Sequence, residues 1–347
     1  MVNGVAAGPT EGPGALAPGG SDLAPCSLTR VTSADIDAQA ASLKEWTQVY
    51  EQLTPGPFFG SLQEICCGGM QIFRETTSQA VHETGGPWRG SRAFGVPVGM
   101  QGTALFRGEP VDAGTMVTLG GDDELDFYTP RGFDILGVVV DESALETHAT
   151  NVEHRDLTAV FGDGGALRPV PERLSELRCL LQSVLGSLEA NPGALQYRQT
   201  QRVLEQSLLS ALVAAVPGDG ASPKPPCTSR QHTVDAAKAF MFSRIAEPIT
   251  VADLCVELGV SRRTLQYSFQ EVLGINPVRF LRALRLNGVR RDLRSTAGRV
   301  ESVQDTAAKW GFWHLGHFVT DYKRMFGELP SETHRRKGRP AIGARGR

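Results

Sequence analysis

The chain has 347 residues and a formal net charge of −3 at pH 7, with 35 Lys and Arg against 38 Asp and Glu. This near balance conceals an asymmetry. Residues 231–347 carry 20 basic and 11 acidic side chains, whereas residues 1–230 carry 15 and 27. The length allows two or three domains, and no stretch approaches the ~18 consecutive apolar residues of a membrane-spanning helix. The composition argues against helical membrane spans and predicts an acidic module followed by a basic one.

Residues 1–27 are rich in Gly, Ala and Pro and lack the cationic start and apolar core of a signal peptide. We therefore expect a disordered N-terminus and a cytoplasmic protein with no membrane partner. The cysteines form no Cys-x-x-Cys pair, and reduced thiols are the expectation in that compartment. Alternation along a strand would point only one of the neighbours Cys66 and Cys67 inward. The six cysteines are Cys26, Cys66, Cys67, Cys179, Cys227 and Cys255.

Residues 59–140 consist of short apolar runs separated by glycine-containing turns. This spacing predicts a small antiparallel barrel or sandwich. The segment has one histidine, His82, whereas a metal site in such a barrel would need several clustered His and Glu ligands. We find no paired carboxylates and no nucleophile–base motif either, so we expect neither a metal centre nor an enzyme. The apolar runs are Met70–Phe73, Ala93–Val98, Met116–Leu119, Leu125–Tyr128 and Phe133–Val140.

Two apolar stripes at helical spacing follow within residues 141–216 and predict a helical hairpin. One stripe runs from Leu174 to Leu188 and the other from Leu204 to Val216. We expect both helices to pack on the barrel, and dimerisation along them is an open alternative. The barrel and the hairpin would form a sensor domain over residues 28–216. The proline-rich residues 217–230 predict a flexible linker.

Residues 231–337 contain one pattern twice. The first halves of the two copies are 52 residues apart and the second halves are 53 residues apart. Each copy reads as a capped helix, a glycine, a short turn, a second helix and a closing Gly-x-x-Pro. Thr250 with Asp253 and Ser302 with Asp305 fit capping boxes, in which a hydroxyl and an acid bind the first free amides of a helix. The pattern predicts a duplicated helix-turn-helix, a motif that reads DNA through the second helix of each copy.

One continuous helix over residues 277–293 is predicted to join the two copies. If the two reading helices occupy successive major-groove segments, they lie about 34 Å apart. Basic residues crowd this connector and continue into a basic tail over residues 338–347, and we expect them to contact phosphate. They are Arg279, Arg282, Arg285, Arg290, Arg291 and Arg294 in the connector, and Arg335, Arg336, Lys337 and Arg339 beyond the second copy.

The blocks Ala246–Pro277 and Gly311–Phe318 resemble the AraC/XylS family of bacterial transcription regulators. Val260–Gln266 looks closest to regulators of ethanolamine operons, and that likeness extends to Trp46–Arg74 and Tyr128–Val140. Residues and resemblance together predict an α+β chain. A small β-barrel or sandwich sensor, cupin-like by resemblance, carries a helical hairpin and precedes an all-α DNA-binding domain. The resemblance also implies a small-molecule effector, with ethanolamine and adenosylcobalamin as candidates.

The resemblance further implies which residues contact DNA. Arg263 and Gln266 can make bidentate contacts with guanine and adenine in the major groove. Leu315 offers only apolar contact and Gly316 no side chain, so we expect the first copy to specify sequence more strongly than the second. The full set is Ser261, Arg262, Arg263, Thr264, Gln266 and Tyr267 in the first copy, and Trp313, His314, Leu315, Gly316, His317, Thr320 and Lys323 in the second.

The expected function is a promoter-binding transcription regulator, an activator that works with RNA polymerase under the control of a small effector. A homodimer is left open. Two other functions remain as alternatives: a barrel that binds a protein partner, and an enzyme barrel tethered to DNA. A closed apolar pocket inside the barrel would favour the sensor, whereas a filled interior with an exposed apolar patch would favour a partner.

Overall fold

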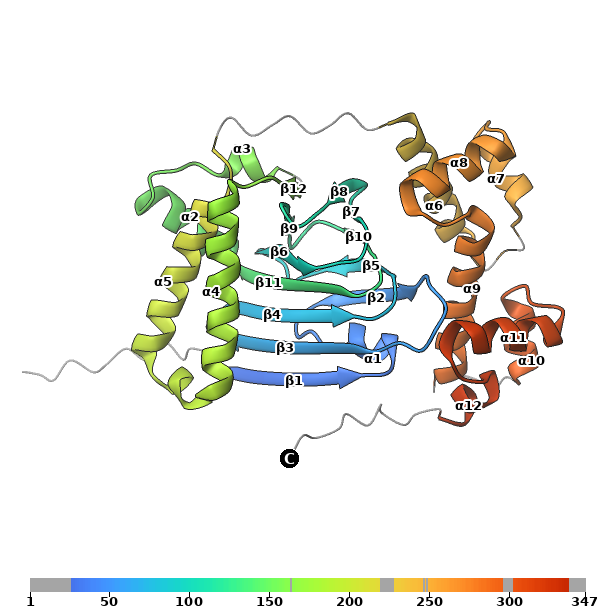
Figure 1. Cartoon of the computed structure of the whole chain (residues 1–347), viewed down its shortest axis with the longest axis horizontal. Helices are drawn as coiled ribbons and strands as arrows, with labels where there is room; N and C mark the ends of the chain where they lie inside the picture. The colour runs from blue at the N-terminus through green and yellow to red at the C-terminus, as the bar shows by residue number, and fades with distance from the viewer. Residues whose placement is uncertain are drawn as a thin grey trace, which may run out of the picture.

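The computed structural model describes residues 26–162, 164–218, 228–245, 247, 249–295 and 302–336 (Figure 1). The expectations for the first 25 residues, for residues 219–227 of the linker with Cys227, and for the basic tail from Lys337 onward lie outside the described residues. Within these ranges, an antiparallel β-sandwich with flanking helices is followed by a purely helical C-terminal part, which confirms the mixed fold class. No helix in the described ranges is long and apolar enough to cross a membrane.

The strands form two sheets whose order is β1-β3-β4-β11-β6-β9-β12 in the larger and β2-β5-β10-β7-β8 in the smaller. Every pair of neighbouring strands is antiparallel. The larger sheet contains β1 (Ser27–Ser33), β3 (Gly60–Cys67), β4 (Met70–Thr77), β6 (Ser91–Gly99), β9 (Met116–Gly120), β11 (Phe133–Asp141) and β12 (Gly165–Leu167). The smaller sheet contains β2 (Thr47–Gln52), β5 (Val81–Gly86), β7 (Ala104–Phe106), β8 (Glu109–Val111) and β10 (Leu125–Thr129).

Three strands lie outside residues 59–140, where the sequence predicts the barrel. These strands, β1, β2 and β12, are each the last strand at an edge of a sheet. Edge strands often carry polar side chains, because the unpaired backbone groups of an apolar edge would pair with another chain. The run Ser27–Ser33 is accordingly exposed or half-buried except at Ser33. Such strands give little of the apolar signal on which the prediction depends.

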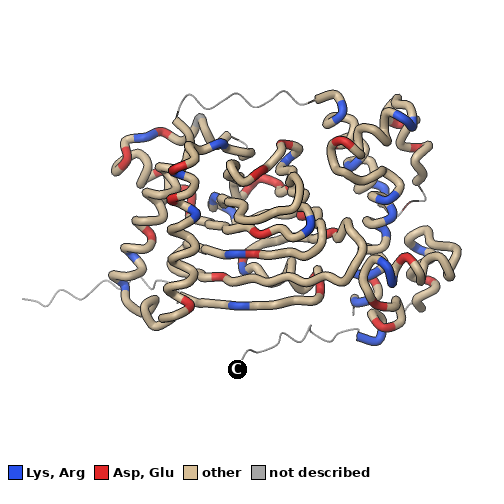
Figure 2. Tube along the Cα trace, in the orientation of Figure 1, with Lys and Arg blue, Asp and Glu red and all other residues tan. Residues whose placement is uncertain are grey.

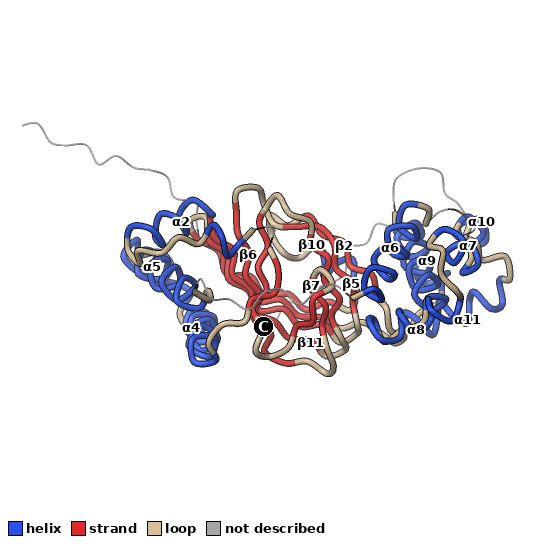
Figure 3. The backbone as a smooth tube through the Cα atoms, turned by 90° about the horizontal axis from the view of Figure 1, so that it is seen from above, coloured by secondary structure: helices blue, strands red, loops and turns tan. Residues whose placement is uncertain are grey.

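Helices cover the outer face of the larger sheet, as seen from above in Figure 3. The predicted apolar stripes lie on α4 and α5, where Leu181 and Leu212 are fully buried in one cluster with Ile72 and Val138 of the sheet. This confirms that the helical hairpin packs on the strands. The helices of this half are α1 (Ile36–Ala40), α2 (Glu142–Asn151), α3 (Thr158–Phe161), α4 (Pro171–Ala190), the 3-10 helix η1 (Pro192–Gln196) and α5 (Arg198–Ala215).

A disulfide joins Cys26 to Cys67, which corrects the expectation that all cysteines are reduced thiols. The two residues are 41 positions apart in sequence, but β1 pairs with β3 and brings their Cα atoms to 4.3 Å. The strand β1 was not predicted, so its proximity to β3 could not be foreseen. Cys67 is buried and Cys66 is only partly buried, in agreement with the expected alternation.

The C-terminal helices reproduce the duplicated pattern. Both capping boxes are present, with Thr250 and Ser302 each accepting from the third amide of its helix. Ser261 caps the helix after the first turn by accepting from Thr264 N, as expected. The helices are α6 (Ser229–Ser243), α7 (Val251–Glu257), α8 (Arg262–Leu273), α9 (Pro277–Arg294), α10 (Val303–Lys309), α11 (Leu315–Phe326) and α12 (Pro330–Arg335).

The glycines that end α7 and α10 show why this pattern needs glycine. Gly259 has φ 61° and Gly311 has φ 80°, values in the left-handed region that other residues rarely adopt. The connector α9 supplies apolar side chains to two separate cores. Phe280 belongs to the cluster around α8, and Val289 belongs to the cluster around α11. One rigid helix therefore holds both helix-turn-helix units.

Candidate nucleic-acid interface and its link to the sandwich

The first reading helix, α8, buries one face and exposes the other. Leu265 and Phe269 are fully buried against α6 and α9. Arg263 and Tyr267 lie one turn apart on the exposed face, where the guanidinium donates to the Tyr267 hydroxyl at 3.4 Å and lies 5.3 Å from its ring centroid. The other predicted DNA-contacting residues of this copy are exposed as well: Ser261, Arg262, Thr264 and Gln266.

The second reading helix, α11, exposes a different chemistry. Trp313 is 80% exposed directly before this helix, and its ring centroid lies 3.7 Å from that of His314. A Cβ added to Gly316 would meet nothing within 4 Å, so the helix surface there is open. Thr320 Oγ1 donates to the carbonyl of Gly316 at 2.9 Å and is committed to its own helix. The remaining predicted contacts are exposed too: Leu315, His317 and Lys323.

A groove separates the two helix-turn-helix units, and α9 forms its floor. Its lining includes Arg262, Trp313 and His317, which are predicted contacts from both copies. Arg282 and Arg285 of α9 line it too. Arg282 pairs with Asp321, and Arg285 donates 3.0 Å bonds to the carbonyls of Glu247 and Ile249. The structure therefore brings five of the thirteen predicted contacts from both copies, Ser261, Arg262, Trp313, His314 and His317, to one basic groove.

Three arginines at the end of α9 point elsewhere, although arginines occur along the whole helix (Figure 2). Arg291 donates to Glu51 of β2 at 2.6 Å, and Arg290 and Arg294 both bind Asp35 just before α1. The expectation that these arginines contact phosphate was therefore wrong. Their guanidinium groups already bind acids of the sandwich, which the sequence placed in a separate, acidic half.

Arg290 occupies the centre of this contact. Its side chain is 7% exposed and reaches Asp37 at 3.1 Å and Glu328 at 3.4 Å, in addition to Asp35. Uncharged contacts lie beside it. Asn287 of α9 donates to the Gln52 carbonyl at 2.9 Å and accepts from the Gln52 amide at 3.2 Å. The sandwich and the C-terminal helices are thus joined by a mostly buried polar interface.

The smaller sheet forms the rest of this interface through one cross-strand row of side chains. The register aligns Glu51 of β2, His82 of β5, Tyr128 of β10 and Leu105 of β7, which we call the outer row. The His82 ring stacks on Tyr128 at 4.0 Å between centroids and lies 5.4 Å from Phe242 of α6.

Charged groups lie next to His82 of the outer row. His82 Nε2 lies 2.8 Å from Asp126 Oδ1, and Lys238 of α6 donates to Asp126 Oδ2 at 2.9 Å. The hydrogen bond from His82, with Lys238 beside it, outweighs burial and lowers the pKa of Asp126 to about 2. Burial lowers the pKa of His82. His82 therefore serves the interface rather than a metal.

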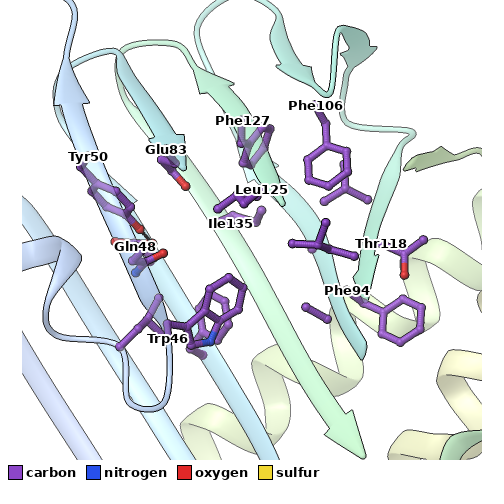
Figure 4. A pocket seen from close by; sticks show the side chains of 17 residues that line it. Trp46, Gln48, Tyr50, Glu83, Phe94, Phe106, Thr118, Leu125, Phe127 and Ile135 are labelled. Atoms are coloured by element: carbon purple, nitrogen blue, oxygen red, sulfur yellow. Dashed lines mark hydrogen bonds between the residues drawn. The ribbon is translucent and has the colours of Figure 1, made fainter. Parts of the chain in front are cut away.

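On each of these four strands, a residue directly next to the outer-row residue points to the other face of the smaller sheet. These residues are Tyr50, Glu83, Phe127 and Phe106, which we call the inner row. They line a cavity of about 50 Å³ between the two sheets (Figure 4). Tyr50 OH donates to Glu75 Oε2 at 2.9 Å, and burial raises the pKa of Glu75 to about 7. Burial and the nearby Glu75 raise the pKa of Glu83 well above its ordinary value.

No motif in the sequence marked the inner row or Glu75 as functional. The available signal was an acid within an otherwise apolar strand, as at Glu75 and Glu83. Which face of the strand such an acid occupies depends on register, and β2 was not predicted at all. The cavity lies between strands that pair only in the folded chain, so its lining could not be assembled from sequence.

Residues 254–336 match a family described as a helix-turn-helix domain. Over 133 residues the chain is 35% identical to the probable thc operon regulatory protein of Rhodococcus erythropolis, covering 37% of this chain and 39% of that one. Over 132 residues it is 29% identical to the XylDLEGF operon transcriptional activator 2 of Pseudomonas putida, covering 38% and 80%. The crystal structure of a probable AraC family transcriptional regulator from Rhodopseudomonas palustris is 34% identical, covers 30% of this chain and 96% of that chain, and has a TM-score of 0.29.

The chain carries the DNA-binding domain of AraC-family transcription regulators. Its relatives are regulators rather than enzymes, in agreement with the expectation from sequence. The chain spans 39% of the length of the Rhodococcus relative and 80% of the Pseudomonas one. In this AraC-type domain, Leu254 to Arg336 include most of α7 and every helix that follows it.

Proposed function

We propose that this protein regulates transcription by binding promoter DNA through the two reading helices, under the control of a small effector bound in the cavity of the sandwich. One observation carries the proposal: a single sheet lines the cavity with its inner row and contacts the AraC-type domain with its outer row. A ligand that displaces Tyr50 or Glu83 acts on the same strands that hold Glu51 and His82. The distance between the two sites is the thickness of one sheet.

The proposed DNA contacts are the thirteen residues named from the sequence, with α8 specifying bases and α11 mainly positioning the domain. The exposure of all thirteen, five of which line the basic groove, supports this assignment. Activation with RNA polymerase remains part of the proposal, in keeping with the word activator in the name of the Pseudomonas relative.

The effector proposal is narrowed by the size of the cavity. About 50 Å³ accommodates a molecule of a few non-hydrogen atoms, since one water-sized probe occupies about 10–15 Å³ by this measure. Ethanolamine is small enough to remain a candidate. Adenosylcobalamin is many times larger and does not fit, so we propose no corrinoid in this cavity. The mainly apolar lining of the cavity also favours a ligand sensor over a barrel that binds a protein partner.

Promoter binding tests the proposal. The full-length protein is titrated onto the DNA upstream of its own gene and onto a scrambled control, at salt concentrations between about 50 and 200 mM. We expect specific binding whose affinity falls steeply with salt, because phosphate contacts release counterions. Addition of a cavity ligand should then change the affinity for the promoter. Equal affinity for the promoter and the scrambled DNA would contradict specific promoter binding. If no cavity ligand changes the affinity for the promoter, effector control is contradicted.

A further inference from the structure

The cavity between the sheets has an unusual charge pattern. Two carboxylic acids, Glu75 and Glu83, line it, and none of its seventeen described lining residues is Lys, Arg or His. Both acids are buried, at 5% and 8% exposure. A buried ionised carboxylate is costly unless a positive group or several hydrogen bonds compensate it. The protein itself brings no positive group into this cavity.

The two acids differ in how far the protein satisfies them. Glu75 accepts from Gln39 Nε2 at 2.8 Å and from Tyr50 OH at 2.9 Å, so each of its oxygens has a donor. Glu83 has a single long contact, 3.4 Å from Thr129 Oγ1 to Oε1. No other donor among the described residues bonds to the Glu83 carboxyl group. Figure 4 shows this carboxyl group directed into the cavity between Tyr50 and Leu125. Glu83 is thus a buried acceptor with free capacity that faces the cavity between the sheets.

The rest of the wall consists mainly of rings and aliphatic side chains. Trp46, Tyr50, Phe73, Phe106 and Phe127 all line the cavity. The face of an aromatic ring attracts a cation placed within about 6 Å of its centre, most strongly where water is excluded. An anion would meet two acids and no positive group in this lining. A neutral ligand without a hydrogen-bond donor would leave the second Glu83 oxygen without a partner.

We infer that this cavity binds a small organic cation, an alkylammonium of about four non-hydrogen atoms, with Glu83 as its counter-ion and the surrounding rings as its walls. This inference rests on the proposed effector role of the cavity and names the chemical class of the effector. Glu75, already bonded twice, holds Tyr50 in place as part of the wall. Burial, and next the neighbouring Glu75, raise the pKa of Glu83 and so favour its protonated form in the absence of ligand. Binding of the ammonium ion releases that proton to solvent.

Matched ligands on the full-length protein test the inference. The probes are propylamine and ethanolamine, compared with 1-propanol and ethylene glycol as neutral counterparts and with propionate as the anion, all at constant ionic strength. We expect the melting temperature to rise with the amines and to stay constant with the neutral and anionic compounds. Calorimetry in two buffers of different ionisation enthalpy should show proton release on binding.

Two variants locate the binding. Glu83→Gln keeps the shape of the side chain and removes the charge, and it should weaken amine binding by about 10- to 100-fold, the usual effect of losing a hydrogen bond to a charged group. Ala93→Leu fills the cavity from the larger sheet and should also abolish the melting shift. The matched control is Glu189→Gln, an exposed acid on α4 that should change nothing. Melting of each variant without ligand shows whether it folds.

The outcomes separate the inference from the proposed function. Stabilisation by the neutral or anionic probes that Ala93→Leu removes would leave the cavity as an effector site and overturn the charge class. An amine shift that survives Glu83→Gln, or the absence of any amine shift, overturns the inference as well. If amines bind as expected but leave promoter affinity unchanged, effector control fails and the cation site stands.

Discussion

Tyr50 and Glu51 are neighbours in β2, yet they serve opposite sides of one sheet. The Tyr50 hydroxyl donates to Glu75 inside the cavity, while Glu51 accepts from Arg291 of α9 at 2.6 Å. Side chains alternate between the two faces of a strand, so these adjacent residues lie on opposite sides of the sheet. The same relationship holds between Glu83 and His82 on β5. The cavity and the C-terminal helical domain are therefore joined by the peptide bonds of individual strands.

The two reading helices should contribute unequally to specificity. Arg263→Ala is expected to cost about 1–3 kcal/mol of discrimination at one base pair, the usual value of a bidentate contact, whereas Leu315→Ala should cost less. Selection of binding sites from random DNA by wild type and both variants measures this. A half-site under α11 that is as sharply defined as the one under α8, and that Leu315→Ala blurs, would show that the asymmetry is wrong.

Lys323 should contribute affinity without sequence preference. It is exposed in the last turn of α11, where a phosphate contact adds one released counterion. Lys323→Ala should weaken binding to all sequences alike and reduce the slope of log affinity against log salt by about one unit. Lys44→Ala, on the sandwich, is the control and should leave the slope unchanged. An unaltered slope in Lys323→Ala would place this lysine away from the phosphates.

Removal of Arg290 should destabilise the whole chain. Its buried guanidinium group binds Asp35, Asp37 and Glu328, and truncation leaves these carboxylates short of a partner. Breaking such a buried ion pair from one side typically costs about 3–5 kcal/mol; because Arg294 still reaches Asp35, we expect about 3 kcal/mol for Arg290→Ala.

Urea unfolding measures this loss. The control is Arg173→Ala, which removes an exposed pair with Glu176 on α4 and should cost less than about 1 kcal/mol. Similar losses in the two variants would mean that the contacts of Arg290 do not form in solution.

The buried acid Glu75 should make stability depend on pH. Burial raises its pKa from 4.5 to about 7 in the folded chain. Between these values the folded state holds a proton that the unfolded state has released, so stability falls as pH rises from about 4.5 to 7. The loss is on the order of 1–3 kcal/mol.

Glu75→Gln isolates this contribution. The variant cannot titrate at this position, and the fall between pH 4.5 and 7 should be smaller than in wild type, as measured by urea unfolding at several pH values. Contributions from His82 are common to both proteins and cancel in the difference. The exposed Glu146→Gln should follow wild type. Parallel curves for wild type and Glu75→Gln would contradict the raised pKa.

Local signals predicted the C-terminal half well. Capping pairs such as Thr250 with Asp253, and glycines such as Gly259, specify helix ends within a few residues, so the sequence alone was sufficient to place α7 to α11. Exposure of the thirteen predicted DNA contacts agrees with that prediction, although their contact with bases remains a proposal. The repeat added certainty because each copy could be compared with the other.

Long-range pairing was not predictable in the same way. The sequence showed arginines on α9 and acids in the first half, but not that Arg290 meets Asp35 across 255 positions. An arginine in a sequence can contact a phosphate or form a buried ion pair. Only the fold shows which of the two contacts it makes. The edge strands β1 and β2 were missed for lack of apolar residues, and with them the disulfide and one wall of the cavity.

Asn287 has a consequence for the sheet that it contacts. It donates to and accepts from the backbone of Gln52, at the last residue of β2, and β2 is the edge of the smaller sheet. One amide side chain thereby occupies hydrogen-bonding groups that an unpaired edge would offer to another strand, a common start of aggregation. The sandwich produced without its C-terminal helices should therefore tend to aggregate through this edge. In the intact protein, a motion that moves α9 away from the sheet must either be small or supply another hydrogen-bonding group to the Gln52 backbone in place of Asn287.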